Sequence, residues 1–137
     1  MLMPDLNDLI NLSDLGFLLG RILIASFFLA VGVRQLKRFS NTVDYVASLK
    51  IPFPKLSAAG AIAVELILGS CIVLGVYCTS SALILAMHTL ITAYLGHNYW
   101  SASEEKEYGL WLHFYKNISI TGGLIILAMA GPGNYAF

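Results

Sequence analysis

The chain has 137 residues, of which 58% are hydrophobic and only 12% are charged, with zero formal net charge and a mean hydropathy of +0.75. Soluble domains carry about a quarter charged residues, whereas residues 66–103 and 117–137 contain no Asp, Glu, Lys or Arg. Such runs reach the length of about 20 residues that crosses a bilayer core. The composition excludes fibrous, disordered, disulfide-framework and nucleic-acid-binding proteins, and it indicates a small polytopic membrane protein.

Four apolar segments are each long enough to span a membrane. They cover residues of about 15–36, 58–77, 82–100 and 110–130. The last is closed by the helix-stop cluster Gly-Pro-Gly at 131–133. Short connections between consecutive spans favour antiparallel neighbours. The sequence therefore predicts an all-α fold, an integral membrane antiparallel four-helix bundle, with residues 1–137 as a single transmembrane domain.

The connections between these spans differ in character. Residues 78–81 are predicted to form a polar turn, and residues 101–109 (SASEEKEYG) a solvated acidic loop. Within residues 39–57, apolar side chains recur every three or four positions, which predicts a short helix at the membrane interface. The prolines in the segment 51–54 then stiffen the chain before the second span.

Basic residues predict the orientation of the bundle, because cytoplasmic loops carry an excess of Lys and Arg. Six lie in or beside the first and third connections, namely Arg34, Lys37, Arg38, Lys50, Lys55 and Lys106. This distribution predicts cytoplasmic first and third connections and periplasmic termini. Residues 1–14 carry three Asp and no Lys or Arg, the opposite of a signal peptide, so no cleavable signal peptide is expected.

Ionisable side chains at membrane depth cost about 2.5–3.5 kcal/mol each on insertion scales, and they are usually paired or functional. Glu65 lies inside the second span, with Arg21 or Lys116 as its candidate cation. Two interpretations of Glu65 stay open: a buried ion pair that fixes helix register, or a carboxylate that handles protons or binds a ligand. His88, flanked by apolar residues, is interpreted as a helix-packing residue ahead of a functional one.

A second polar group is predicted nearer the cytoplasmic side. His97 and His113 share one level there, where they could bind a metal, bind a quinone head group or form interfacial hydrogen bonds. Trp100, Lys116 and Asn117 belong to this level and could stack on such a head group or hydrogen-bond to it. The histidines have no cysteine or carboxylate at ligand spacing, so no metal site is assigned. No nucleotide-binding loop or nucleophile elbow occurs, and no catalytic residue is assigned.

Several motifs follow one another along the chain. They are Arg21, Phe28, Gly32 and Leu36; Ile51-Pro52-Phe53-Pro54; Glu65 with Gly69 and Gly75; His97-Asn98-Tyr99-Trp100; and Phe114-Tyr115-Lys116-Asn117 before Gly122-Gly123 and Gly131-Pro132-Gly133. In this order and spacing the chain resembles the DoxX-like family of small four-span bacterial membrane proteins. The resemblance implies a plasma-membrane protein associated with redox systems. Named members of that family are subunits of a thiosulfate:quinone oxidoreductase, and others are linked to thiol and oxidative-stress defence.

Three functions are compatible with these residues. The first is a membrane subunit of an oxidoreductase complex in the bacterial inner membrane, with a redox protein as its partner and quinone as its candidate cofactor. The second is a binding or transport module for a small solute or protons, with Arg21 and Glu65 lining its path. The third is a membrane scaffold. We rank the first highest, as a subunit rather than a self-sufficient enzyme, and leave homo-oligomerisation open.

Overall fold

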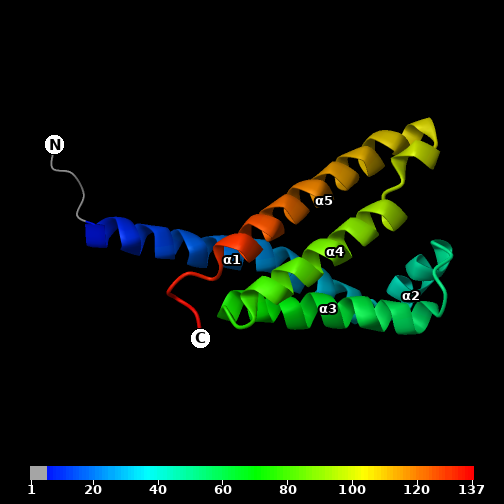
Figure 1. Ribbon diagram of the computed structural model, residues 1–137. Coiled ribbons are helices and arrows are strands. Elements are labelled where there is room, and N and C mark those ends of the chain that lie inside the picture. Colours follow the sequence, from blue (N-terminus) through cyan, green and yellow to red (C-terminus); the bar gives the residue numbers. More distant parts are fainter. Residues whose placement is uncertain (1–5) are drawn as a thin grey trace.

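The computed structural model describes residues 6–137, and in that range the chain is helical without any strand (Figure 1). Its elements in chain order are α1 (Leu6–Lys37), α2 (Phe39–Ser48), α3 (Pro54–Leu74), α4 (Cys78–Gly96), the 3-10 turn η1 (Tyr99–Ser101) and α5 (Glu104–Ala130). Residues 1–5 lie outside the described range, and with them part of the segment for which no cleavable signal peptide was expected.

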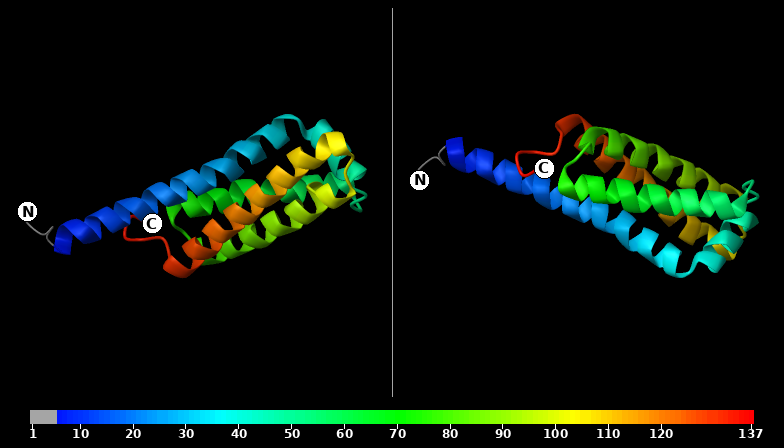
Figure 2. Two further views of the ribbon diagram at one scale, coloured as in Figure 1. Left: turned by 90° about the horizontal axis from the view of Figure 1, so that it is seen from above. Right: turned by 90° about the horizontal axis from the view of Figure 1, so that it is seen from below.

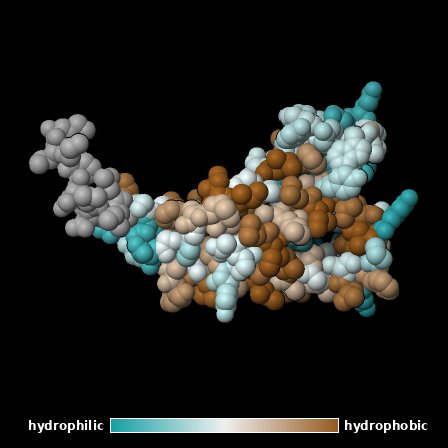
Figure 3. Space-filling view, viewed as in Figure 1, coloured by the Kyte–Doolittle hydropathy of each residue, from teal (hydrophilic) through white to brown (hydrophobic). Residues whose placement is uncertain are grey.

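Four helical segments are long and apolar enough to cross a membrane: Asn11–Lys37, Pro54–Leu74, Cys78–Ser101 and Glu104–Ala130. Hydrophobic side chains cover much of the face seen in Figure 3, while hydrophilic ones gather at the α2 end. Leu19, Met87 and Ile126 are all more than half exposed. Soluble proteins rarely expose so much apolar surface, whereas lipid provides matching surroundings for it. The predicted all-α membrane bundle is confirmed.

The hairpin between α3 and α4 turns at residues 75–77, and the prediction of a polar turn at 78–81 is wrong. Gly75 ends α3 at φ +78°, a left-handed conformation that glycine adopts without strain. Residues 78–81 belong to α4, and the hydroxyl groups of Thr79 and Ser80 hydrogen-bond to carbonyl groups within the bundle. Ser80 Oγ, for example, donates to Tyr77 O at 3.0 Å.

The prediction of a solvated loop at 101–109 is also wrong for most of its length, because α5 begins at Glu104. Ser103 takes the extended backbone conformation of a residue that precedes a helix. Glu105 and Glu107 join Glu104 in the first turn. Carboxylates in a first turn are stabilised by the helix dipole, by about 0.3–1 kcal/mol each. The acidic run therefore starts a helix at the end of the bundle.

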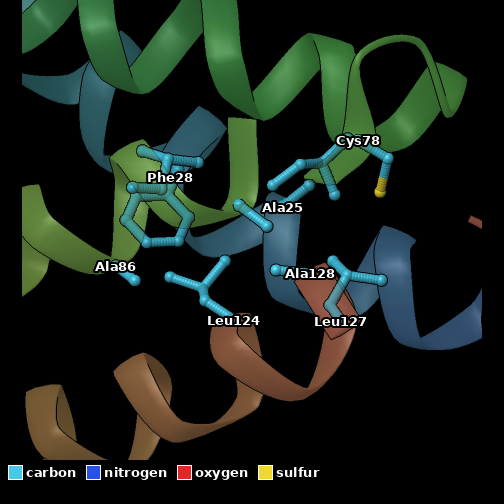
Figure 4. Close-up of a cluster of buried hydrophobic side chains, with 10 residues drawn as sticks. Ala25, Phe28, Cys78, Ala86, Leu124, Leu127 and Ala128 are labelled. Carbon is cyan, nitrogen blue, oxygen red and sulfur yellow. The ribbon is translucent and has the colours of Figure 1, made fainter. Parts of the chain in front are cut away.

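Two helix pairs build the bundle (Figure 2): α1 packs along α3, and α4 packs along α5. The α3–α4 hairpin joins the pairs, and α1 contacts α5 only sparsely. A buried apolar cluster lies near that hairpin (Figure 4) and consists of Ala25, Phe28, Ile72, Cys78, Ala82, Leu85, Ala86, Leu124, Leu127 and Ala128. Toward α2, α4 and α5 diverge from α1 and α3 (Figure 1).

The short helix predicted within residues 39–57 is present as α2, which packs against α3 and α1. The C-terminus and the start of α1 lie at the opposite end of the molecule (Figure 2), as an even number of spans requires. The six basic residues of the first and third connections lie at the α2 end, where α1 ends and α3 and α5 begin. The bundle therefore has one basic end and one end that carries the α3–α4 hairpin.

The C-terminal segment 131–137 folds back over the hairpin end. The amide and side chain of Asn134 donate to the two oxygens of Asp14 at 3.0 and 2.8 Å. The amide of Phe137 donates to Leu74 O at 3.0 Å. These hydrogen bonds join the segment to α1 and α3, so that it closes this end of the bundle.

Candidate functional site

A cavity of about 420 Å³ lies between α1, α2, α3 and α4. Most of its lining is apolar and includes Phe27 and Phe28 of α1. Glu65 and His88 line it near the middle of α3 and α4, and His97 lines it where α4 ends. Small-molecule sites in proteins combine this volume range with a few convergent polar groups in apolar walls. The cavity is therefore the main candidate for a ligand site.

Glu65 and His88 form a pair across the α3–α4 hairpin, with Glu65 Oε1 3.2 Å from His88 Nε2. Glu65 stands eleven positions before Val76 and His88 eleven positions after Tyr77. Residues equally far from an antiparallel turn meet at one level, because both helices rise by about 1.5 Å per residue. The structure therefore places a carboxylate and an imidazole in hydrogen-bond contact inside the bundle.

Neither candidate cation, Arg21 or Lys116, forms an ion pair with Glu65 in the structure. Arg21 lies beside Gly75 at the end of α3, which is about 15 Å along the helix axis from Glu65. Its Nη2 donates to the carbonyl oxygen of Tyr135. Lys116 lies on α5 and forms no ion pair with any residue that the structure describes. The carboxylate is instead paired with an imidazole, which the sequence analysis assigned to helix packing.

Three buried polar atoms of cavity-lining residues have no hydrogen-bond partner among the described residues: Gln35 Oε1, Glu65 Oε2 and His97 Nδ1. An unsatisfied buried polar group costs about 1–3 kcal/mol, and folded proteins satisfy nearly all such groups. A carboxylate oxygen such as Glu65 Oε2 accepts hydrogen bonds when it is ionised. The three atoms favour a ligand that brings hydrogen-bonding groups to both ends of an apolar body.

Tyr45 connects α2 to α4 at the edge of this cavity. Its hydroxyl group donates to Gly96 O at 3.4 Å. Burial raises the pKa of Tyr45 above its usual value, so the hydroxyl group stays protonated and remains a donor at neutral pH. Tyr45 and Gly96 both line the cavity, so this contact joins α2 to α4 at its edge.

A second hollow, of about 700 Å³, runs along α5 beside Phe27 of α1, and we call it the α5 groove. Its lining residues are Phe27, His97, Trp111, Leu112, His113, Tyr115, Lys116, Asn117, Ser119 and Ile120. The rings of His97 and His113 stack with centroids 5.3 Å apart. No third metal-ligating side chain joins them in the part of the chain that the structure describes. Phe27, His97 and Asn117 also line the cavity, so the two hollows adjoin.

The structure thus divides the predicted polar residues among three places. Glu65, His88, His97 and Asn117 line the cavity, His113 and Lys116 line only the α5 groove, and Arg21 and Trp100 line neither. Trp100 packs edge-on against Tyr99 in the 3-10 turn η1. Arg21 is fully buried at the C-terminal end of α3, where the helix dipole favours a cation. A shared path lined by Arg21 and Glu65 is therefore not formed.

The cavity also contains Gln35 and Tyr45, which the sequence pattern does not single out. Gln35 stands between the basic residues that end the first span, and the charge count treats it as part of a solvated flank. Tyr45 lies beside the apolar stripe of the short helix rather than in it. Two features of the sequence could have indicated that these residues line a cavity. Gln35 is a polar residue at the end of a span, and Tyr45 is an aromatic residue next to the apolar stripe of a short helix.

Four membrane-length helices around a mainly apolar cavity with one carboxylate–imidazole pair define a small multi-pass membrane protein. The family model described as DoxX matches residues 16–98. The chain belongs to the DoxX family, and the resemblance seen in its motifs is confirmed.

Two Escherichia coli (strain K12) proteins are similar to this chain. Inner membrane protein YphA is 36% identical over 116 residues, which cover 85% of this chain and 83% of YphA. Inner membrane protein YqjF is 32% identical over 126 residues, which cover 92% of each chain. No solved structure matches the chain.

Proposed function

We propose that this protein is a quinone-binding subunit of a redox system in the bacterial inner membrane. The observation that carries the proposal is the mainly apolar cavity, which has unpaired buried atoms on Glu65 and His97. A quinone head group is a flat, largely apolar ring with two oxygen atoms that form hydrogen bonds, which suits a mainly apolar cavity with a few polar groups. The names of the two relatives support the inner-membrane location.

The proposed chemistry assigns proton handling to the Glu65–His88 pair and to His97. Oxidation of a quinol releases two electrons and two protons. One quinol hydroxyl group donates to Glu65 Oε2, and the pair takes up its proton as a general base. The second hydroxyl group faces His97 Nδ1, and this nitrogen takes up the second proton. The electrons pass to a partner redox protein, while this chain binds the ring and positions it.

The proposal also includes an orientation. The α2 end faces the cytoplasm and both termini face the periplasm, because the six basic residues of the connections gather at the α2 end. His97 then lies on the cytoplasmic side of the cavity. Glu65 and His88 lie deeper in the bilayer, near the middle of their helices.

A matched pair of α3 variants tests the cavity, with photoreactive azido-ubiquinone as the probe. Ala61 lines the cavity, whereas Ala59 is exposed on the outer surface. Ala61→Phe and Ala59→Phe add the same ring to the same helix, but only Ala61→Phe fills the space for a head group. We expect Ala61→Phe to lose most of the labelling that unlabelled ubiquinone competes away, and Ala59→Phe to retain it.

Labelling would be measured on the full chain in bacterial membranes, and the labelled peptides identified by mass spectrometry. Thermal unfolding of both variants serves as the control for folding. Equal labelling of the two folded variants, or labels only on peptides that do not line the cavity, would contradict the proposal.

A further inference from the structure

The α5 groove shares Phe27, His97 and Asn117 with the cavity, whereas Lys116 and His113 line the groove alone and have no part in the quinone proposal. Lys116 supplies a positive charge to the groove, and the stacked rings of His97 and His113 supply further nitrogen atoms. None of the described residues that line the groove is acidic. The groove therefore presents a basic surface in an otherwise apolar part of the molecule.

Lys116 has no counter-ion in the described part of the chain. The nearest acidic residue on α5 is Glu107, nine positions earlier, which corresponds to about 13 Å along the helix axis. A lysine on a membrane-spanning helix is unfavourable unless it reaches the interface or meets an anion. The position of Lys116 consequently favours an anion from the surroundings of the protein.

The other walls of the groove indicate that this anion carries a hydrocarbon chain. Trp111, Lys116 and Ile120 follow one another along α5, from the end near the connection toward the middle of the helix. Aromatic and basic side chains are typical of the headgroup level, and aliphatic ones of the acyl-chain level. Phe27 and Leu112 add further apolar surface to the groove. The basic and aromatic side chains of the groove thus lie toward the level of a phospholipid headgroup, and Ile120 lies toward the level of its acyl chains.

We propose that the α5 groove binds an anionic phospholipid, with its phosphate at Lys116 and His113 and one acyl chain along Phe27 and Ile120. The phosphate position at Lys116 and His113 lies outside the cavity, although the groove shares Phe27, His97 and Asn117 with it, and the lipid proposal does not depend on the quinone proposal. The choice of occupant rests on charge complementarity together with the apolar walls.

Phosphatidylglycerol and phosphatidylcholine with identical acyl chains are suitable probes, because they differ in net headgroup charge. The full chain, purified in a non-ionic detergent, would be titrated with each lipid, and bound lipid would be counted by native mass spectrometry. We expect phosphatidylglycerol to bind about fivefold more tightly, as one lysine near an anionic headgroup predicts. Lys116→Gln should remove this preference, whereas Lys116→Arg should retain it.

Lys106→Gln is the matched control, because Lys106 lies in the first turn of the same helix and outside the groove. Lys106→Gln should retain the preference for phosphatidylglycerol. The cavity variant Ala61→Phe should retain it as well, and that result would show that lipid binding in the groove does not require the cavity. The proposal is overturned by equal binding of the two lipids, by an unchanged preference in Lys116→Gln or by an equal loss in Lys106→Gln. Displacement of phosphatidylglycerol by equimolar inorganic phosphate would identify a free-anion site and would also overturn it.

Discussion

Glu65→Gln is expected to weaken quinol binding by about tenfold to a hundredfold, because hydrogen bonds to charged groups contribute about 1.5–3 kcal/mol. The substitution keeps the shape of the side chain beside His88 and removes the carboxylate to which the proposed function assigns the quinol hydroxyl group. Quinone should bind equally or more tightly, since its oxygen atoms only accept hydrogen bonds and the new amide can donate. The measurement is the concentration of each redox form that displaces azido-ubiquinone.

The difference between the two redox forms separates a ligand-binding role of Glu65 from a structural one. Glu104→Gln removes the same charge in the first turn of α5, outside the cavity, and should change neither affinity. If Glu65→Gln lowered both affinities equally and also lowered the thermal stability, the carboxylate would support helix packing only. Unchanged binding of quinol would remove Glu65 from the proposed site altogether.

Gly75→Ala is expected to destabilise the fold by about 3 kcal/mol. Gly75 has φ +78°, which strains any residue with a Cβ atom. The added Cβ would also lie 2.9 Å from Ala136 Cα and would collide with the guanidinium group of Arg21. The variant must therefore distort the hairpin or displace the C-terminal segment. The free energy of unfolding would be measured by circular dichroism during titration with a denaturing detergent.

Gly60→Ala is the corresponding control, because Gly60 lies within α3 and a Cβ atom there would meet nothing within 4 Å. Alanine is favoured over glycine inside a helix, so this variant should be as stable as the original chain or slightly more stable. Similar stability of the two variants would show that the hairpin accepts a side chain at Gly75, contrary to the geometry described above.

The four spans could be predicted from the sequence, because long segments without charge have few alternatives to crossing a membrane. The partner of Glu65 could not, because it depends on the position of one turn. A turn centred on residues 78–81 sets Glu65 opposite Tyr94, whereas the observed turn sets it opposite His88. The resulting error is about 9 Å along the helix axis. Local hydropathy does not resolve that turn, since the serine and threonine hydroxyl groups bond within the bundle.

The cavity was predictable only in part. Polar residues inside spans usually face the interior, which is how Glu65 and His97 were identified. The role of Tyr45 depends on contact between α2 and α4. The surroundings of Arg21 depend on the path of the C-terminal segment. Both are tertiary arrangements between segments far apart in the chain, and no local pattern specifies them.

The packed apolar cluster and the cavity occupy opposite ends of the bundle, and Phe28 is the one residue of the cluster that also lines the cavity. Substitutions elsewhere in the cavity can therefore accumulate during evolution with little effect on the contacts that hold the hairpin end together. Such a division lets one scaffold acquire new ligand preferences without passing through unfolded intermediates. Relatives that share these helices need not share a ligand, and the residues at positions such as Ala61 and Gln35 would distinguish them.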